Sequence, residues 1–326
     1  MKLRGIEFGP CLDAAGVRGF FGEGWWFHHL PLARFVFNFT GSTRVAKTAT
    51  LLPHRGNMPL RGKEKRYGPR ELFPRCIWWS WSRGIALNAV GLSGPGTQEL
   101  FAQGLLADEK APFMISVMPV SYSQKERLEE FQKFCVLLEH ELRKARLPIG
   151  LQINLSCPNT KLDPHELARE ATLFLDEASR LNIPLVVKIN ILVPPEAAQS
   201  IARHRACDAL CFSNTIPFGE LPEAIPWKRW FPEGSPLARR EASFGGGGLS
   251  GSPLLPLVAE YLRQLRTLGI EKPLNVGGGI LSRRDVDTLV QAGLRRGIDS
   301  IFIGSVAMLR PWNIRSVIRR AHQLLA

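Results

Sequence analysis

The segment 154–160, which reads Asn-Leu-Ser-Cys-Pro-Asn-Thr, holds the residue types best suited to chemistry. It follows an apolar run from Ile149 to Ile153, so we expect it at the carboxyl end of a buried strand. Its carboxamides, Asn154 and Asn159, offer donors and acceptors in fixed geometry, which suits a cyclic imide or amide ligand. Cys157, held over such a ligand, could accept a proton. The alternative is a structural cysteine between asparagine-capped turns.

Two lysines and two further asparagines are predicted to lie near this segment. Lys188 leaves an apolar strand, and a buried ammonium needs an anion or a dipole as its partner. A core carboxylate is the alternative partner. Lys47 follows the same logic, although its pattern also fits an exposed lysine. Asn88 and Asn214 would complete, with Asn154 and Asn159, a neutral hydrogen-bonding cage for a planar heterocycle; singly, each fits a turn or a cap.

Glycine-rich turns come late in the chain, at 245–251 and 277–279. Glycine lets a backbone N–H approach a phosphate without interference from a Cβ atom. Barrels place their phosphate sites after the last two strands, so these turns favour a barrel over a doubly wound sheet. Any single turn of this kind also fits a simple loop hinge.

Short apolar runs alternate with amphipathic segments along the whole chain. We expect strands at 10–14, 44–49, 113–117, 150–155, 185–189, 209–213, 273–276 and 300–303. Helices are expected at 123–144, 164–181, 195–203, 253–268, 283–292 and 312–325. Strand and helix repeated in this way predict an α/β fold, a (β/α)8 TIM barrel. Residues 1–326 form one predicted domain, and the long segments 50–96 and 217–243 are interpreted as functional loops over its C-terminal face.

Composition excludes several classes of protein. The net charge is +13, but it is spread along the chain without a nucleic-acid-binding motif, so we expect no nucleic-acid partner. The cysteines fit neither zinc spacing nor a disulfide framework, and we expect no metal. The start lacks the apolar region of a secretory signal, so a reduced cytoplasmic protein is expected.

The Asn-Leu-Ser-Cys-Pro-Asn segment resembles the signature of class 1 dihydroorotate dehydrogenases, in which the cysteine is the catalytic base. The resemblance continues in order along nearly the whole chain. It implies FMN as cofactor and oxidation of (S)-dihydroorotate to orotate in pyrimidine biosynthesis. Cys157 would be the base, hydride would pass to flavin N5, and Lys47 would be the second catalytic residue. A homodimer is the family expectation.

The resemblance assigns further residues to the two ligands. The implied substrate-binding residues are Lys47, Asn88, Val90, Gly91, Leu92, Asn154, Asn159, Asn214 and Thr215. The implied cofactor-binding residues are Ala14, Ala15, Gly16, Lys47, Thr48, Asn88, Asn154, Lys188, Ser213, Gly247, Gly248, Gly278, Gly279, Gly304 and Ser305.

The chain departs from the family pattern at several points, which keeps alternatives open. Ser93-Gly94 replaces Pro-Asn or Asn-Asn, Val90 replaces Met, Arg283 or Arg284 replaces Gly, and the loop after Asn159 is short. A sister FMN oxidoreductase acting on another dihydropyrimidine or cyclic amide is therefore one alternative. A non-redox lyase using Lys188 as a Schiff base is a second. A basic scaffold without turnover is a third.

The electron acceptor is left open between fumarate, quinone, and NAD through a partner flavoprotein. Tryptophan-rich clusters at 25–29 and 78–81 fit either a core or subunit contact, or a peripheral contact with a membrane surface.

Overall fold

A parallel sheet closed into a barrel forms the centre of the molecule. The computed structural model describes residues 1–31, 33–62, 64–107, 111–145, 147–155 and 164–326. Seven strands are hydrogen-bonded in the order β3-β15-β14-β11-β10-β9-β8. Their bounds are Cys11–Asp13 (β3), Phe113–Val117 (β8), Ile149–Asn154 (β9), Leu185–Lys188 (β10), Ala209–Phe212 (β11), Leu274–Val276 (β14) and Ser300–Ile303 (β15).

The segment 43–49 closes the barrel between the two edge strands. Thr43 forms a parallel bridge with Leu12 of β3, and Val45 forms one with Met114 of β8. The predicted strand at 44–49 therefore occupies its expected place, but through isolated bridges rather than a continuous ladder. The predicted (β/α)8 barrel is confirmed.

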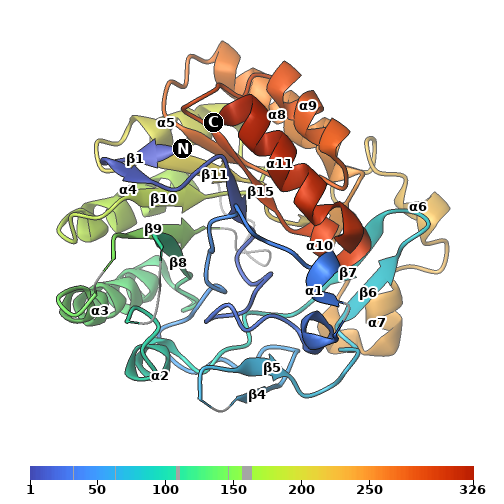
Figure 1. The fold of residues 1–326 in the computed structure, drawn as a ribbon, viewed down its shortest axis with the longest axis horizontal. Helices are drawn as coiled ribbons and strands as arrows, with labels where there is room; N and C mark the ends of the chain where they lie inside the picture. Colours follow the sequence, from blue (N-terminus) through green and yellow to red (C-terminus); the bar gives the residue numbers. More distant parts are fainter. Residues whose placement is uncertain (32, 63, 108–110, 146, 156–163) are drawn as a thin grey trace.

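Helices surround this barrel (Figure 1). They are α2 (Thr97–Ala102), α3 (Gln124–Leu142), α4 (Pro164–Ser179), α5 (Pro195–Arg203), α8 (Leu254–Thr267), α9 (Arg283–Gln291), α10 (Ser305–Leu309) and α11 (Ile314–Leu325). Local sequence explains their starts: Ser123 and Glu126 form a capping box for α3, and Pro195 occupies the first turn of α5. No helix in the described part of the chain has both the length and the apolar character needed to cross a membrane.

Each barrel strand sends alternate side chains inward and outward. On β9, Leu151 and Ile153 belong to the core that includes the buried faces of the helices, so Gln152 and Asn154 point into the barrel. A separate apolar cluster fills the lower interior and includes Leu12 and Val186. The hairpin of β1 (Lys2–Leu3) and β2 (Ile6–Glu7) adds Met1, Leu3 and Phe8 to this cluster, and so closes the amino end of the barrel.

The long segments over the carboxyl end are more ordered than predicted. A four-stranded antiparallel sheet has the order β12-β13-β7-β6. Its strands are β6 (Ile77–Ser80), β7 (Ile85–Asn88), β12 (Ile216–Pro217) and β13 (Gly248–Gly251). The long segments also contain a hairpin of β4 (Leu60–Gly62) and β5 (Tyr67–Pro69), and the helices α6 (Trp227–Trp230), α7 (Pro236–Arg240) and η2 (Ala242–Phe244). The short helices η1 (Trp26–His29), α1 (Ala33–Val36) and η3 (Pro311–Asn313) lie outside these segments. The position of the long segments over this face agrees with the prediction, and the structure adds short strands and helices within them.

Candidate active site

One large cavity, of about 1640 Å³, lies at the carboxyl ends of the barrel strands. Most of the predicted site residues line it, although they come from distant parts of the chain. They are Ala14, Ala15, Gly16, Lys47, Thr48, Asn88, Val90, Gly91, Leu92, Asn154, Lys188, Ser213, Asn214, Thr215, Gly278, Gly279, Gly304 and Ser305. Cys157 and Asn159 lie outside the described residues, so their roles stay predictions.

Gly247 and Gly248 do not line the cavity, and the predicted turn there is different in the structure. Gly248 begins β13, which pairs with β7. A Cβ atom at Gly248 would lie 2.1 Å from Oγ1 of Thr215, and one at Gly247 would lie 3.0 Å from the carbonyl oxygen of Asn88. These glycines therefore allow the close approach of β13 to two cavity-lining segments.

Lys188 carries a buried cation at the carboxyl end of β10, and the residue is only 6% exposed. Its ammonium nitrogen lies 4.9 Å from the ring centre of Phe302. None of the hydrogen bonds and ion pairs between described residues involves this ammonium, so the alternative of a core carboxylate partner finds no support there. Burial lowers the pKa of Lys188, against a smaller opposing effect of Cys211.

Lys47 carries the second cation and is half-buried rather than exposed. Its ammonium donates a hydrogen bond to the carbonyl oxygen of Ser93 (2.6 Å) and lies 5.1 Å from the ring centre of Phe20. Burial lowers the pKa of Lys47 to about 8, against an opposing effect of Glu23. Ser93, which departs from the family pattern, thus positions this lysine through its backbone carbonyl oxygen.

A pair of carboxamides lies between neighbouring strand ends. Nδ2 of Asn214 donates a hydrogen bond to Oδ1 of Asn154 (2.8 Å), which joins the segment after β11 to β9. Nδ2 of Asn190 donates to the carbonyl oxygen of Thr215 (2.8 Å), and Asn190 also lines the cavity. The sequence reasoning did not identify Asn190, although its place two residues after Lys188, at a strand end, was a usable signal.

The loop 89–93 is shaped by the segment that precedes it in the chain. The backbone N–H of Asn57 donates to the carbonyl oxygen of Val90 (2.9 Å), and Nδ2 of Asn57 donates to that of Ala89 (2.8 Å). A Cβ atom at Gly56 would lie 2.5 Å from the carbonyl oxygen of Gly91. Gly56 therefore lets the two segments pack closely enough to present Val90, Gly91 and Leu92 to the cavity.

Backbone donors are available at the opposite wall. Gly278 and Gly279 follow β14 with φ of 128° and 81°, a region that favours glycine. Neither backbone N–H donates a hydrogen bond to another described residue. Gly304 and Ser305, between β15 and α10, line the cavity as well. These strand ends can hold an anionic group such as a phosphate.

Comparisons with known proteins agree with this arrangement. The family profile described as dihydroorotate dehydrogenase matches residues 61–296. The chain belongs to the dihydroorotate dehydrogenase family. The catalytic subunit of dihydroorotate dehydrogenase B (NAD(+)) from Desulforudis audaxviator is 26% identical over 97% of this chain and 88% of its own. Dihydroorotate dehydrogenase A (fumarate) from Lacticaseibacillus paracasei is 28% identical over 87% of this chain and 84% of its own.

Membership in the dihydroorotate dehydrogenase family makes this chain an oxidoreductase acting on a CH–CH group. The family profile matches residues 61–296, a range that includes the strand ends from Asn88 to Gly279 and most of the cavity-lining residues. It begins after Lys47, a residue that the sequence predicts for the site and that the structure places in the cavity.

Proposed function

We propose that this chain oxidises (S)-dihydroorotate to orotate with FMN, in pyrimidine biosynthesis. The observation that carries the proposal is the paired carboxamides of Asn154 and Asn214 in the same cavity as two cationic lysines. Carboxamides match the donors and acceptors of a pyrimidine ring, and an ammonium matches a carboxylate. The names of the relatives support the same substrate.

The residues of the cavity fit FMN. The unpaired backbone N–H groups of Gly278 and Gly279, with Gly304 and Ser305, would hold the phosphate. Lys188 would lie near the flavin ring system, where its buried ammonium would gain the anionic partner that it lacks among the described residues. Bound there, FMN would supply the two-electron oxidant that accepts hydride from C6 of the substrate.

The remaining steps fall to residues of this chain. Cys157 would take the proton from C5, so that the substrate loses one proton and one hydride and gains a double bond. Lys47 would hold the substrate carboxylate, positioned by Ser93. Asn88, Asn154, Asn159 and Asn214 would hold the ring, with Asn190 keeping Thr215 in place.

The test is an anaerobic visible spectrum of the purified protein before and after addition of dihydroorotate. Flavin bands that bleach are the expected result. Bands that persist would retain the cofactor but move the activity to another dihydropyrimidine or cyclic amide. A colourless protein that does not take up added FMN would contradict the proposal and favour the lyase alternative.

Replacing Cys157 by Ala tests the role of the base. Flavin reduction at neutral pH should slow by a factor of about 10² to 10⁴, the usual contribution of general base catalysis, while FMN stays bound. Cys157→Ser replaces the thiol by a hydroxyl. It should shift the pH dependence of flavin reduction to higher pH rather than abolish reduction. Reduction at the wild-type rate in Cys157→Ala would remove Cys157 from the mechanism.

We also propose that the chain forms a homodimer. If it acts as the dihydroorotate dehydrogenase B relatives do, we further propose that a separate subunit accepts the electrons. Support for the second part is the description of several relatives as catalytic subunits. Light scattering of the purified chain tests the first part, and reduction of NAD by the chain alone would contradict the second.

A further inference from the structure

A group of large apolar side chains is exposed beside the cavity. Phe73 is 65% exposed, Trp81 57% and Trp312 61%. Three segments, 25–36, 70–83 and 305–315, supply this group, which we name the aromatic rim. The aromatic rim consists of Leu30, Phe35, Leu72, Phe73, Trp81 and Trp312.

The members of the aromatic rim are joined into one surface. The ring of Trp26 meets that of Phe73 edge-on at 5.9 Å, and its Nε1 donates to the carbonyl oxygen of Leu72 (2.9 Å). Nε1 of Trp81 donates to the carbonyl oxygen of Met308 (3.3 Å) in α10. Helix α1, which carries Phe35, packs against both η1 and η3, and η3 carries Trp312.

This surface borders the cavity itself. Leu72, Phe73 and Trp81 line the cavity as well as being exposed. The indole N–H groups of Trp26 and Trp81 already donate to backbone carbonyls. The rings can therefore be buried away from water without leaving an unpaired N–H donor. An apolar surface of this kind is typical of an interaction site rather than of free protein surface.

The charged residues of the three rim segments are mostly arginines. The three segments that form it contain one acidic residue, Glu71, whose carboxylate accepts a hydrogen bond from the backbone N–H of Arg75 (2.9 Å). The guanidinium of Arg310 lies 5.8 Å from the ring centre of Trp312. The arginines of the three segments whose side chains the structure describes are Arg70, Arg75, Arg83, Arg310 and Arg315.

We propose that the aromatic rim docks on an anionic lipid surface, so that the mouth of the cavity lies at the membrane interface. Tryptophan, phenylalanine and leucine enter the boundary between headgroups and acyl chains, while surrounding arginines bind anionic headgroups. The five described arginines against one acid favour this partner over an uncharged protein surface. The contact is peripheral, since it uses the faces of short helices and turns.

The experiment is sedimentation of the full chain with vesicles of phosphatidylcholine and phosphatidylglycerol, and with vesicles of phosphatidylcholine alone. The wild type should pellet with the anionic vesicles, and less so as salt is raised, because salt screens the arginines. The double variant Phe73→Asp/Trp312→Asp should bind at least about tenfold more weakly, since it loses apolar insertion and gains two negative charges.

Matched controls separate docking from general changes. Val136→Asp places the same charge on a 57% exposed apolar residue of α3, outside the aromatic rim, and should bind vesicles as the wild type does. Arg83→Glu/Arg315→Glu reverses two rim charges without touching apolar residues, and should weaken binding to anionic vesicles only. Unfolding temperatures of all variants check that they fold.

Three results would overturn the proposal. The wild type could stay in the supernatant with anionic vesicles at low salt. Val136→Asp could weaken binding as much as Phe73→Asp/Trp312→Asp does. Light scattering could show a dimer that only the rim variants dissociate, which would assign this surface to a second copy of the chain. Flavin reduction by dihydroorotate is measured separately, so loss of the proposed activity does not affect this test.

Discussion

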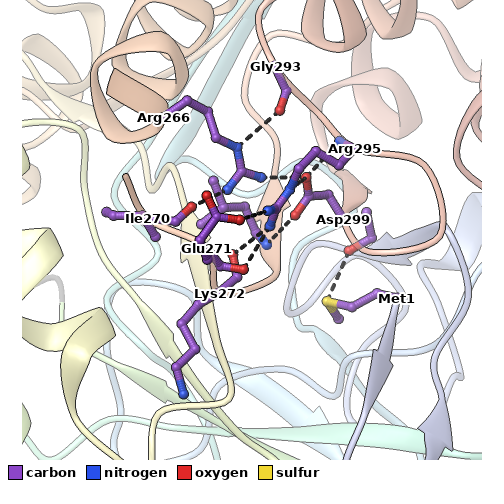
Figure 2. Close-up of polar contacts among 10 residues, drawn as sticks. Met1, Arg266, Ile270, Glu271, Lys272, Gly293, Arg295 and Asp299 are labelled. Carbon is purple, nitrogen blue, oxygen red and sulfur yellow. Dashed lines mark hydrogen bonds and ion pairs between the residues drawn. The ribbon is translucent and has the colours of Figure 1, made fainter. Parts of the chain in front are cut away.

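Two buried charged side chains have opposite surroundings at the two ends of the barrel: one is paired with counter-ions, and the other has none among the described residues. At the amino end, Asp299 is fully buried just before β15, and its carboxylate binds Arg266, Arg295 and the backbone N–H of Leu274 (Figure 2). At the carboxyl end, Lys188 is almost as buried but has no carboxylate partner among the described residues. A fully paired buried charge serves the fold, whereas a buried charge without a counter-ion indicates a place for an anionic ligand.

The polar groups of the network at the amino end find their partners within the chain itself. Arg266 also donates to the carbonyl oxygen of Ile270 (2.6 Å), and Arg295 donates to that of Glu271 (2.9 Å), which links the ends of α8 and α9 to the starts of two strands (Figure 2). Oγ of Ser300 contacts Sδ of Met1 (3.3 Å), which ties the hairpin at the bottom to the same region. This end is therefore expected to respond to mutation through stability rather than activity.

The largest effect should come from breaking the amino-end network. Asp299→Ala leaves two guanidinium groups and two backbone N–H groups without their acceptor, so the free energy of unfolding should fall by about 3–5 kcal/mol. Chemical denaturation measures it. Glu271→Ala is the control: its carboxylate also pairs with Arg295 but is 84% exposed, so about 0–1 kcal/mol is expected. Equal losses in both variants would show that burial does not distinguish the two pairs.

Lys188→Met tests the unpaired buried charge at the carboxyl end of the barrel. Removing a buried ammonium without a counter-ion should leave the free energy of unfolding of the FMN-free protein unchanged or raise it by about 1 kcal/mol. FMN affinity should fall by about tenfold or more, the worth of one charged contact. Fluorescence titration with FMN measures this. A large loss of stability with unchanged FMN affinity would make Lys188 a structural residue.

Lys47 should make substrate binding depend on pH. Because burial lowers its pKa to about 8, orotate affinity should be constant below pH 8 and fall about tenfold per pH unit above it, as the ammonium is lost. Lys47→Met should bind orotate weakly and without this dependence. For stability the sign is opposite: the unfolded lysine holds its proton to a higher pH, so the ligand-free protein should gain stability between pH 8 and about 10.

The smallest effect should follow from Asn190→Ala. Its side chain positions Thr215 from the neighbouring strand, so substrate KM should rise by about fivefold, the worth of one neutral hydrogen bond, while FMN affinity stays the same. Steady-state kinetics and FMN titration together check this split. Gln199→Ala is a suitable control, since its side chain makes a comparable hydrogen bond to the carbonyl oxygen of Leu268, outside the cavity. A change in FMN affinity would mean that Asn190 positions residues of the cofactor site as well as of the substrate site.

Much of the barrel could be predicted because its signals are local. Runs such as Phe113–Val117 and Ser300–Ile303 are short and apolar, and the pattern of α3 repeats every three to four residues. The strand-end positions of Lys188 and Asn154 then follow from parallel packing, which gathers all carboxyl ends on one face. The predicted helix starts also agree closely with the structure, because Pro195 and the Ser123 capping box act within one turn.

The sheet over the cavity could not be predicted by the same means. β7 pairs with β13, whose residues lie about 160 positions later in the chain, and the register places Asn88 opposite Gly248. No local pattern encodes a pairing at that separation. The 247–251 glycines looked like a phosphate turn because a turn and a close backbone approach both select glycine.

The sequence by itself determined the alternation of strands and helices, the family, and the residue types at the strand ends, because each depends on short-range patterns. Only the tertiary structure decided that Ser93 holds Lys47, that Asn190 holds Thr215, and that Lys188 lacks a carboxylate partner among the described residues. It also brought three distant segments together into the aromatic rim. These features depend on which side chains meet in space, and that is set by the closure of the barrel and the packing of long segments upon it.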